Sequence, residues 1–198
     1  MQTTYMLAGG SDSKYEDFGR KLAAAVSSIH AGHLRIVSCS FAWPREEWEK
    51  KFVERQAWLK RLFGGDTEVT LALPTKFEAQ VRTADVVYLH GGDSVLLAHY
   101  LDQLAEPQQL FAGKIIIGSS AGANWLSTAY WSGAWREARR GAGIVPQNIM
   151  VHYGKAAWPE DLRGPIDWAK AEAELRAIIP VGSQITYLPE GEFVVVTQ

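Results

Sequence analysis

The sequence predicts an α/β fold in which helices cover both faces of a mostly parallel sheet. Short apolar runs alternate with longer stretches whose apolar residues recur at helical spacing. Several of the apolar runs end in glycine-rich turns, as strands that lead into helices often do in such folds. The length of 198 residues fits one domain spanning residues 1–198. We expect the functional site at the carboxyl ends of the strands.

The elements follow in chain order from these patterns. Strand-like runs occupy residues 3–8, 33–42, 67–72, 85–90 and 114–118. Helical stretches occupy residues 14–29, 45–63, 75–83, 93–104 and 166–178. Residues 129–165 are rich in Gly, Trp and Arg, which predicts loops. The last two runs, 184–188 and 193–197, are strand-like and flank the turn sequence PEGE.

Composition argues against several classes of protein. Twenty Lys and Arg against 22 Asp and Glu give a net charge of −2, so no basic excess points to nucleic acid. The single cysteine, Cys39, excludes an internal disulfide framework and a multi-cysteine zinc site. The N-terminus lacks the pattern of a signal peptide, and no apolar run approaches the ~20 residues of a membrane span. We therefore expect a cytoplasmic protein without a membrane partner.

A nucleophile motif follows the run at 114–118. The chain reads Gly118-Ser119-Ser120-Ala121-Gly122, which is G-x-S-x-G with Ser120 at its centre. A nucleophilic serine needs a sharp strand-to-helix turn, and flanking glycines let the backbone pass without a Cβ clash. The next N–H, that of Ala121, would point at a developing oxyanion. The alternative is a glycine-rich turn with a spare hydroxyl.

A serine nucleophile needs a general base, and two of the five histidines are candidates. His90 ends the run at 85–90, at the sheet edge where Ser120 is expected. His152 is the one histidine that follows Ser120 in the sequence. Position alone leaves both open.

The acid that would orient the histidine also has two candidates. Glu137 is the one acid between Ser120 and His152, and it lies in an Arg-rich stretch typical of surface ion pairs. Glu190 lies in the turn LPEG directly after a strand-like run, a position suited to a site. The alternative interpretation of Glu190 is a plain turn carboxylate.

The loop Gly91-Gly92-Asp93 ends another strand-like run and offers backbone N–H groups near the expected nucleophile. The sequence has no GxGxxG and no GK[ST] motif, which argues against nucleotide binding. Gly9-Gly10-Ser11 carries a still weaker phosphate-binding signal. There is no HExxH and no repeat of carboxylates, so we expect neither a metal nor another cofactor.

Four segments together resemble, in order, the motifs of the peptidase E/cyanophycinase family of serine peptidases. They are HGGDSVLLAHYL, GSSAGANWLS, GIVPQNIMVHYG and ITYLPEGEFVVV, and the resemblance spans about residues 84–197. It implies a fold similar to class I glutamine amidotransferases, with a serine rather than a cysteine at the nucleophile turn. It also implies roles for five residues: a catalytic set of Ser120, His152 and Glu190, and backbone oxyanion donors at Gly92 and Ala121.

Two departures from the family pattern concern the substrate. The family often has three glycines in the loop, whereas His90 holds the first position here and is expected to stand close to Ser120. Peptidase E recognises an N-terminal aspartate through arginines at the start of the helix after the histidine. The segment GPIDWAKAEAELRA has none in its first turns, so the resemblance does not extend to aspartate specificity. The remaining candidate cations are Arg136, Arg139, Arg140, Lys155 and Arg163.

The resemblance implies a serine exopeptidase that hydrolyses dipeptides or short peptides, as a monomer or homodimer. Further candidates for substrate contact are His90, Asp93, Tyr153 and Trp168. The Trp-rich region 125–168 is expected to form a pocket wall or a lid. Two alternatives remain: an esterase or amidase on the same machinery, and a catalytically inactive binding homologue.

Overall fold

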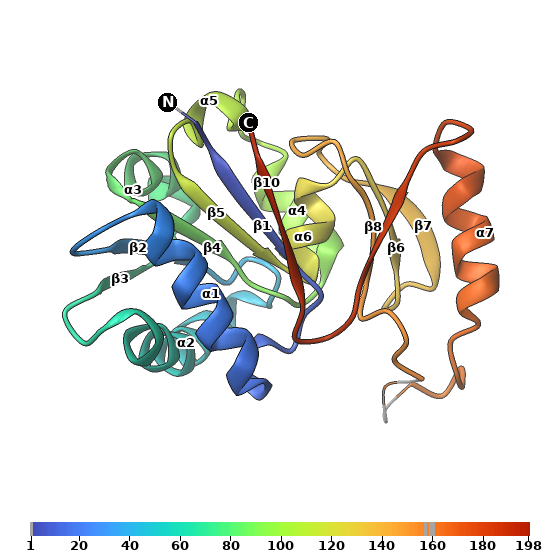
Figure 1. The fold of residues 1–198 in the computed structure, drawn as a ribbon, viewed down its shortest axis with the longest axis horizontal. Coiled ribbons are helices and arrows are strands. Elements are labelled where there is room, and N and C mark those ends of the chain that lie inside the picture. The colour runs from blue at the N-terminus through green and yellow to red at the C-terminus, as the bar shows by residue number, and fades with distance from the viewer. Residues whose placement is uncertain (1, 157, 159–160) are drawn as a thin grey trace.

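The computed structural model describes residues 2–156, 158 and 161–198, whose strands form two sheets (Figure 1). The larger sheet contains, in spatial order, β10 (Phe193–Thr197), β1 (Thr4–Ala8), β5 (Ile115–Ser119), β4 (Val86–Leu89), β2 (Arg35–Cys39) and β3 (Glu68–Leu71). β10 runs antiparallel to β1, and the other neighbours are parallel. The predicted α/β class is confirmed.

Helices pack on both faces of the larger sheet. One face is covered by α1 (Glu16–Ile29) and most of α2 (Trp48–Phe63). The other is covered by α3 (Phe77–Thr83), α4 (Ser94–Leu101) and α6 (Ala121–Leu126). The short α5 (Pro107–Leu110) precedes β5, and 3₁₀ turns occupy Asp12–Lys14, Arg45–Glu47 and Pro74–Lys76. No helix in the described residues is both long and apolar enough to cross a bilayer.

The two faces of the larger sheet form two separate cores, because successive strand residues point to opposite sides. In β1, Leu7 packs in one core and Met6 in the other. In β5, Ile116 and Ile117 divide in the same way, and both are fully buried. Burial of each such side chain stabilises the fold by about 1.5–3 kcal/mol. The central strands therefore hold the loops at their carboxyl ends rigidly.

The second sheet corrects the prediction of loops for residues 129–165. It contains, in spatial order, β7 (Glu137–Arg140), β6 (Ala129–Ser132), β8 (Asn148–Val151) and β9 (Ile185–Leu188), and α7 (Trp168–Ile178) packs against it (Figure 1). These strands have four residues each, and the edge strand β7 reads EARR. Charges suit an edge strand but erase the apolar pattern by which a strand is recognised.

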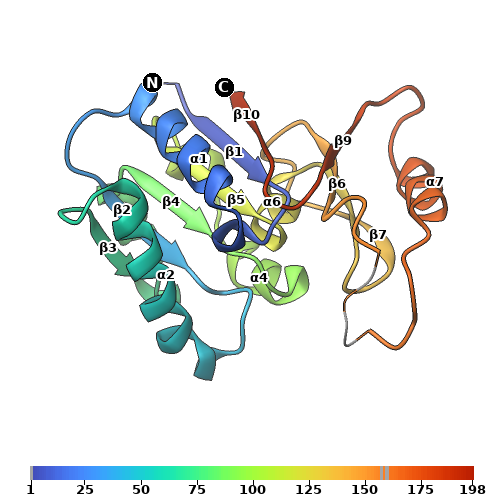
Figure 2. The ribbon, with the colours of Figure 1, turned by 60° about the horizontal axis from the view of Figure 1, so that its bottom comes forward.

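The carboxyl ends of the central strands meet at one edge of the larger sheet, as Figure 2 shows for β1, β5 and β4. Ala8 of β1 lies opposite Ser119 of β5, and Leu89 of β4 lies opposite Gly118. The smaller sheet joins this edge through backbone hydrogen bonds, such as His152 N–H to the Gly9 carbonyl at 3.0 Å. β9 and β10 belong to different sheets, so the turn between them bridges both. Ser120, His152 and Glu190 lie where these segments converge.

Candidate active site

Ser120 lies on a sharp turn between β5 and α6. Its φ of 48° and ψ of −103° are strained for a residue with a side chain. Backbone hydrogen bonds hold the turn on both sides, from Ser120 N–H to the Ala8 carbonyl at 3.0 Å and from Asn124 N–H to the Ser120 carbonyl at 2.9 Å. A Cβ on Gly122 would stand 2.2 Å from the Leu89 carbonyl oxygen, and one on Gly118 would also clash. The glycines of G-x-S-x-G are therefore sterically required.

His152 follows β8 with a φ of 54°, and its ring lies against the loop after β1. Its N–H bonds to the Gly9 carbonyl, and a Cβ on Gly10 would come within 2.4 Å of Cε1 of the ring. In the sequence, Gly9-Gly10 carries only a weak phosphate-binding signal. In the structure the two glycines make room for the imidazole and for the LPEG turn, whose Pro189 carbonyl would clash with a Cβ on Gly9.

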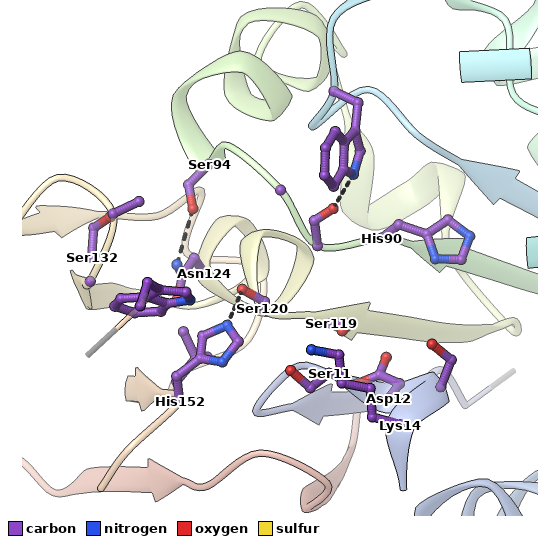
Figure 3. A pocket seen from close by; sticks show the side chains of 18 of the residues that line it. Ser11, Asp12, Lys14, His90, Ser94, Ser119, Ser120, Asn124, Ser132 and His152 are labelled. Carbon is purple, nitrogen blue, oxygen red and sulfur yellow. Dashed lines mark hydrogen bonds between the residues drawn. The ribbon is translucent and has the colours of Figure 1, made fainter. Parts of the chain in front are cut away.

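A chain of hydrogen bonds joins three side chains from three separate elements. Ser120 Oγ lies 2.8 Å from His152 Nε2, and His152 Nδ1 lies 2.7 Å from Glu190 Oε1. Figure 3 shows the imidazole pointing at the Ser120 hydroxyl. The His152 and Glu190 side chains are only 14% and 15% exposed. A nucleophile, a base in contact with it and an acid that orients the base are the parts that acyl transfer requires.

The Glu190 carboxylate accepts further hydrogen bonds. Lys155 Nζ lies 2.8 Å from the same Oε1, and the Tyr15 hydroxyl lies 3.4 Å from Oε2. The hydrogen bond from His152 lowers the pKa of Glu190 most, burial opposes it, and Lys155 and Ser11 lower it further. Glu190 is therefore ionised at neutral pH. Glu137, the other sequence candidate, pairs with Arg139 on edge strand β7.

His90 does not take the position expected for it beside Ser120. Its ring is 3% exposed, stacks on Tyr88 with centroids 4.5 Å apart, and bonds through Nε2 to Ser38 Oγ at 2.8 Å. Figure 3 shows it directed away from Ser120. Burial lowers the pKa of His90 well below its usual value, and the charge of Arg55 lowers it further. His90 is thus a neutral ring in the core, although it reaches the cavity wall.

Two backbone N–H groups are available beside Ser120. The amides of Gly92 and Ala121 donate to no acceptor in the part of the chain that the structure describes. Gly92 has a φ of 149°, and a Cβ there would lie 2.4 Å from the Ala42 carbonyl oxygen. The loop is held by Trp43, whose Nε1–H donates to the Gly91 carbonyl at 2.7 Å. Amides at these places are suited to an oxyanion on a carbonyl attacked by Ser120.

A cavity of about 530 Å³ opens over Ser120, a volume typical of small-ligand sites. Its wall includes Trp158; residues 157 and 159–160 of the expected wall or lid lie outside the described residues. Cationic side chains in the wall are Lys14, Lys51, Arg55 and Lys155. Sequence reasoning missed the first three, although Lys51 and Arg55 are four residues apart and so share a face of α2. No three His, Cys, Asp or Glu of the described residues are grouped to hold a metal.

The cavity contains a buried carboxylate that the sequence analysis also missed. Asp12 is 6% exposed and accepts a hydrogen bond through Oδ2 from the Tyr88 hydroxyl. Its Oδ1 has no partner among the described residues. Burial raises the pKa of Asp12, while Ser119, Tyr88, Arg55 and His152 lower it. The available signal was its position just after the glycine pair that ends β1.

Three of the proposed substrate contacts lie outside the cavity wall. Asp93 caps α4, with Oδ1 accepting from Val95 N–H at 2.7 Å. Tyr153 and Trp168 pack against each other, with ring centroids 5.1 Å apart. The arginines considered for acid recognition also lie outside the wall and bind other groups: Arg136 and Arg163 bond to Asp161, Arg139 to Glu137, and Arg140 to the Ile178 carbonyl.

Comparison with known proteins gives one family match and two similar structures. A family model described as Peptidase family S51 matches residues 50–177, more than half of the chain. The structure is similar to the crystal structure of a peptidase from an acI-B1 Actinobacterium, with a TM-score of 0.72 and 18% identity over 99% of this chain and 84% of that one. It is also similar to a protein assigned to peptidase E from Listeria monocytogenes EGD-e, with a TM-score of 0.65 and 16% identity over 100% and 98% of the two chains. No curated protein matches. At these identities the two structures establish the fold.

Proposed function

The chain belongs to peptidase family S51, and we propose that it is a serine exopeptidase that removes the first residue of dipeptides or short peptides. One observation carries the proposal: the unbroken chain of hydrogen bonds from Ser120 through His152 to Glu190. The three residues come from distant parts of the sequence, and Ser120 holds a strained backbone conformation at their meeting point. Such strain in a well-packed turn is characteristic of functional sites.

The first half of the proposed reaction forms an acyl-enzyme. Ser120 Oγ attacks the scissile carbonyl carbon while His152 Nε2, 2.8 Å away, accepts the hydroxyl proton. Ionised Glu190 stabilises the imidazolium through Nδ1. The N–H groups of Gly92 and Ala121 stabilise the tetrahedral oxyanion, and each such donor typically contributes about 2.7–4 kcal/mol. The intermediate collapses when His152 returns the proton to the leaving amine.

The second half regenerates the enzyme. Water enters the place of the departed amine and loses a proton to His152 as its oxygen attacks the ester carbonyl. The same two amides stabilise the second oxyanion, and His152 then protonates Ser120 Oγ as the carboxylic acid leaves. In both halves of the reaction, His152 accepts and returns each proton that is transferred.

The charges of the cavity favour a substrate that carries an acidic group. Among the described residues, four cationic side chains and one carboxylate, Asp12, line it. Two of these cations are already paired, Lys51 with Glu54 and Lys155 with Glu190. In the described part of the chain no salt bridge joins a carboxylate to Lys14 or Arg55. The Arg55 guanidinium donates to Ser13 Oγ at 3.1 Å. We propose that Lys14 and Arg55 attract an acidic first residue of the substrate. They would do so in place of arginines at the start of α7.

The test is a screen of purified protein and its Ser120→Ala variant against dipeptides that begin with Asp, Glu, Asn, Leu or Lys. Free and N-acetylated forms are compared by mass spectrometry. We expect cleavage that depends on Ser120, that is fastest for Asp or Glu, and that falls on acetylation. Arg55→Gln should reduce the preference for Asp over Asn, whereas Arg61→Gln, on the same helix but outside this cavity, should not.

Each contrary result points to a different conclusion. Undiminished cleavage by Ser120→Ala would remove Ser120 from the mechanism. Hydrolysis of p-nitrophenyl acetate without cleavage of any peptide would favour an esterase. Failure to turn over any substrate, together with failure of Ser120 to react with diisopropyl fluorophosphate, would favour a binding homologue, because a merely structural serine is a weak nucleophile.

A further inference from the structure

Lys155 contacts the proposed catalytic set at Glu190, the member farthest along the hydrogen-bond chain from Ser120. The segment His152-Tyr-Gly-Lys155 forms a tight turn, closed by Lys155 N–H donating to the His152 carbonyl at 3.0 Å, with Gly154 at a φ of 81°. Trp168 Nε1–H donates to the Lys155 carbonyl at 3.0 Å. These contacts hold the lysine backbone from two directions. They leave its side chain to lie along the cavity wall.

The lysine ammonium and the imidazole share one acceptor atom. Lys155 Nζ lies 2.8 Å from Glu190 Oε1, and His152 Nδ1 lies 2.7 Å from the same oxygen. The two nitrogens are therefore within about 5.5 Å of each other. Trp158 packs against both partners, with the imidazole 5.5 Å and the ammonium 5.1 Å from its ring. The Lys155 side chain is only 24% exposed, so solvent screens the pair incompletely.

We propose that Lys155 is a positioning residue that fixes the Glu190 carboxylate against His152 and sets the pH below which the imidazole stops acting as a base. The positive charge of Lys155 beside the imidazole makes protonation of the imidazole less favourable. Glu190 Oε1, which also binds Lys155, stabilises an imidazolium less than an unshared carboxylate oxygen would. Removal of the Lys155 charge has the same consequence through both effects: protonation of His152 becomes easier. This inference rests on the proposed role of His152 as the base.

Other charged groups also surround His152 and stay in place when Lys155 is changed. Asp12, from the turn after β1, interacts with it electrostatically. Glu190 reaches it from the turn between β9 and β10, and the Ser120 hydroxyl from the turn before α6. Further groups of the cavity wall are Lys14, Lys51, Arg55 and the neutral His90, while Tyr15 bonds to the far oxygen of Glu190. Lys155 is distinguished from these cations by direct contact with Glu190.

Coulomb's law gives the size of the effect. For charges no more than about 5.5 Å apart, an effective dielectric constant between that of water and that of a protein surface predicts that Lys155→Met moves the acid limb of Ser120 reactivity to higher pH by about 0.5–2 units. Lys155→Arg keeps the charge and should restore at least half of the shift. Lys51→Met is the matched control, because Lys51 lines the same cavity over the Trp43 ring, without touching Glu190.

Two measurements test the inference. NMR titration of the imidazole, assigned by comparison with His152→Gln, gives the midpoint directly. The rate of Ser120 modification by diisopropyl fluorophosphate as a function of pH gives the acid limb of reactivity. We expect both to move up together in Lys155→Met, with thermal unfolding confirming that each variant is folded.

Three outcomes would overturn the inference: a midpoint within 0.3 units of wild type in Lys155→Met, an equal shift in Lys51→Met, or a reactivity limb that does not follow the imidazole. The NMR titration needs no turnover. A failure of Ser120 to react at any pH would therefore count against the proposed function, while the titration still decides the role of Lys155.

Discussion

The imidazole of His152, the proposed catalytic base, packs closely against Gly10, so a substitution at Gly10 can displace it while every reacting side chain stays unchanged. A Cβ on Gly10 would stand 2.4 Å from His152 Cε1 and 2.7 Å from Nε2. An ordinary carbon–carbon contact is about 3.5 Å, so the ring must retreat by about 1 Å in Gly10→Ala. The 2.8 Å bond between Ser120 and His152 cannot survive such a shift. Displacements of this size cost about 10²-fold in rate, or about 2.7 kcal/mol of barrier.

A second glycine supplies the control for backbone strain. Gly32 has a φ of 98°, close to the 105° of Gly10, and a Cβ there would meet nothing within 4 Å. Both Ala variants should lose about 1–3 kcal/mol of stability to the unfavourable φ, as measured by urea unfolding. Only Gly10→Ala should slow the reaction of Ser120 with diisopropyl fluorophosphate by about 10²-fold. Equal rates in the two variants would refute the reasoning, because the displaced ring would then not be the base.

Three further predictions follow from the same geometry. His152→Ala should lower peptidase activity by about 10²–10⁴-fold, and Glu190→Gln by less, because Gln keeps an acceptor for Nδ1 but loses the charge; equal losses in kcat/KM would contradict these roles. The lowered pKa of Glu190 means that its contribution to stability is complete above its ordinary pKa of 4.5 and is lost as the pH falls below it, so the difference in urea midpoint between wild type and Glu190→Gln should shrink from pH 6 to pH 3. Burial raises the pKa of Cys39 to about 12, so iodoacetamide at pH 8 should modify it only in urea, and rapid modification of the native protein would show that the core around it opens.

The larger sheet could be predicted from the sequence because its central strands are buried on both faces. Runs such as VVYL and III, at residues 86–89 and 115–117, are continuous and apolar, and each is followed by a turn rich in glycine. The smaller sheet could not be predicted in this way. Its strands are short, and β7 carries a glutamate and two arginines. They become strands through pairing with neighbours rather than through a pattern of their own.

The same distinction applies to the candidate site: one part follows from a local sequence pattern, and the other depends on contacts between distant segments. The elbow around Ser120 obeys a local steric rule, so its pattern is legible in five consecutive residues. Contacts between His152 and Glu190 depend on how two sheets meet, and the residues alone left His90 and Glu137 as alternatives. Only the resemblance to a family selected among them.

The roles of Gly10, Asp12 and Lys155 depend on three-dimensional neighbours. Gly10 is needed because a ring 142 positions later in the sequence lies against it. Asp12 and Lys155 resemble ordinary surface charges in the sequence, and their importance follows from what stands beside them in the folded chain. No periodicity or motif of single residues carries that information.

The central claim is that His152 activates Ser120 as a nucleophile. The most direct test is to treat wild type and His152→Ala with diisopropyl fluorophosphate at pH 7.5 and to map the adduct by mass spectrometry. The account predicts a diisopropylphosphoryl group on Ser120 of the wild type, none on the adjacent Ser119, and a rate at least 10²-fold lower in His152→Ala. A wild type that stays unmodified, or equal modification of Ser120 in both proteins, would contradict it.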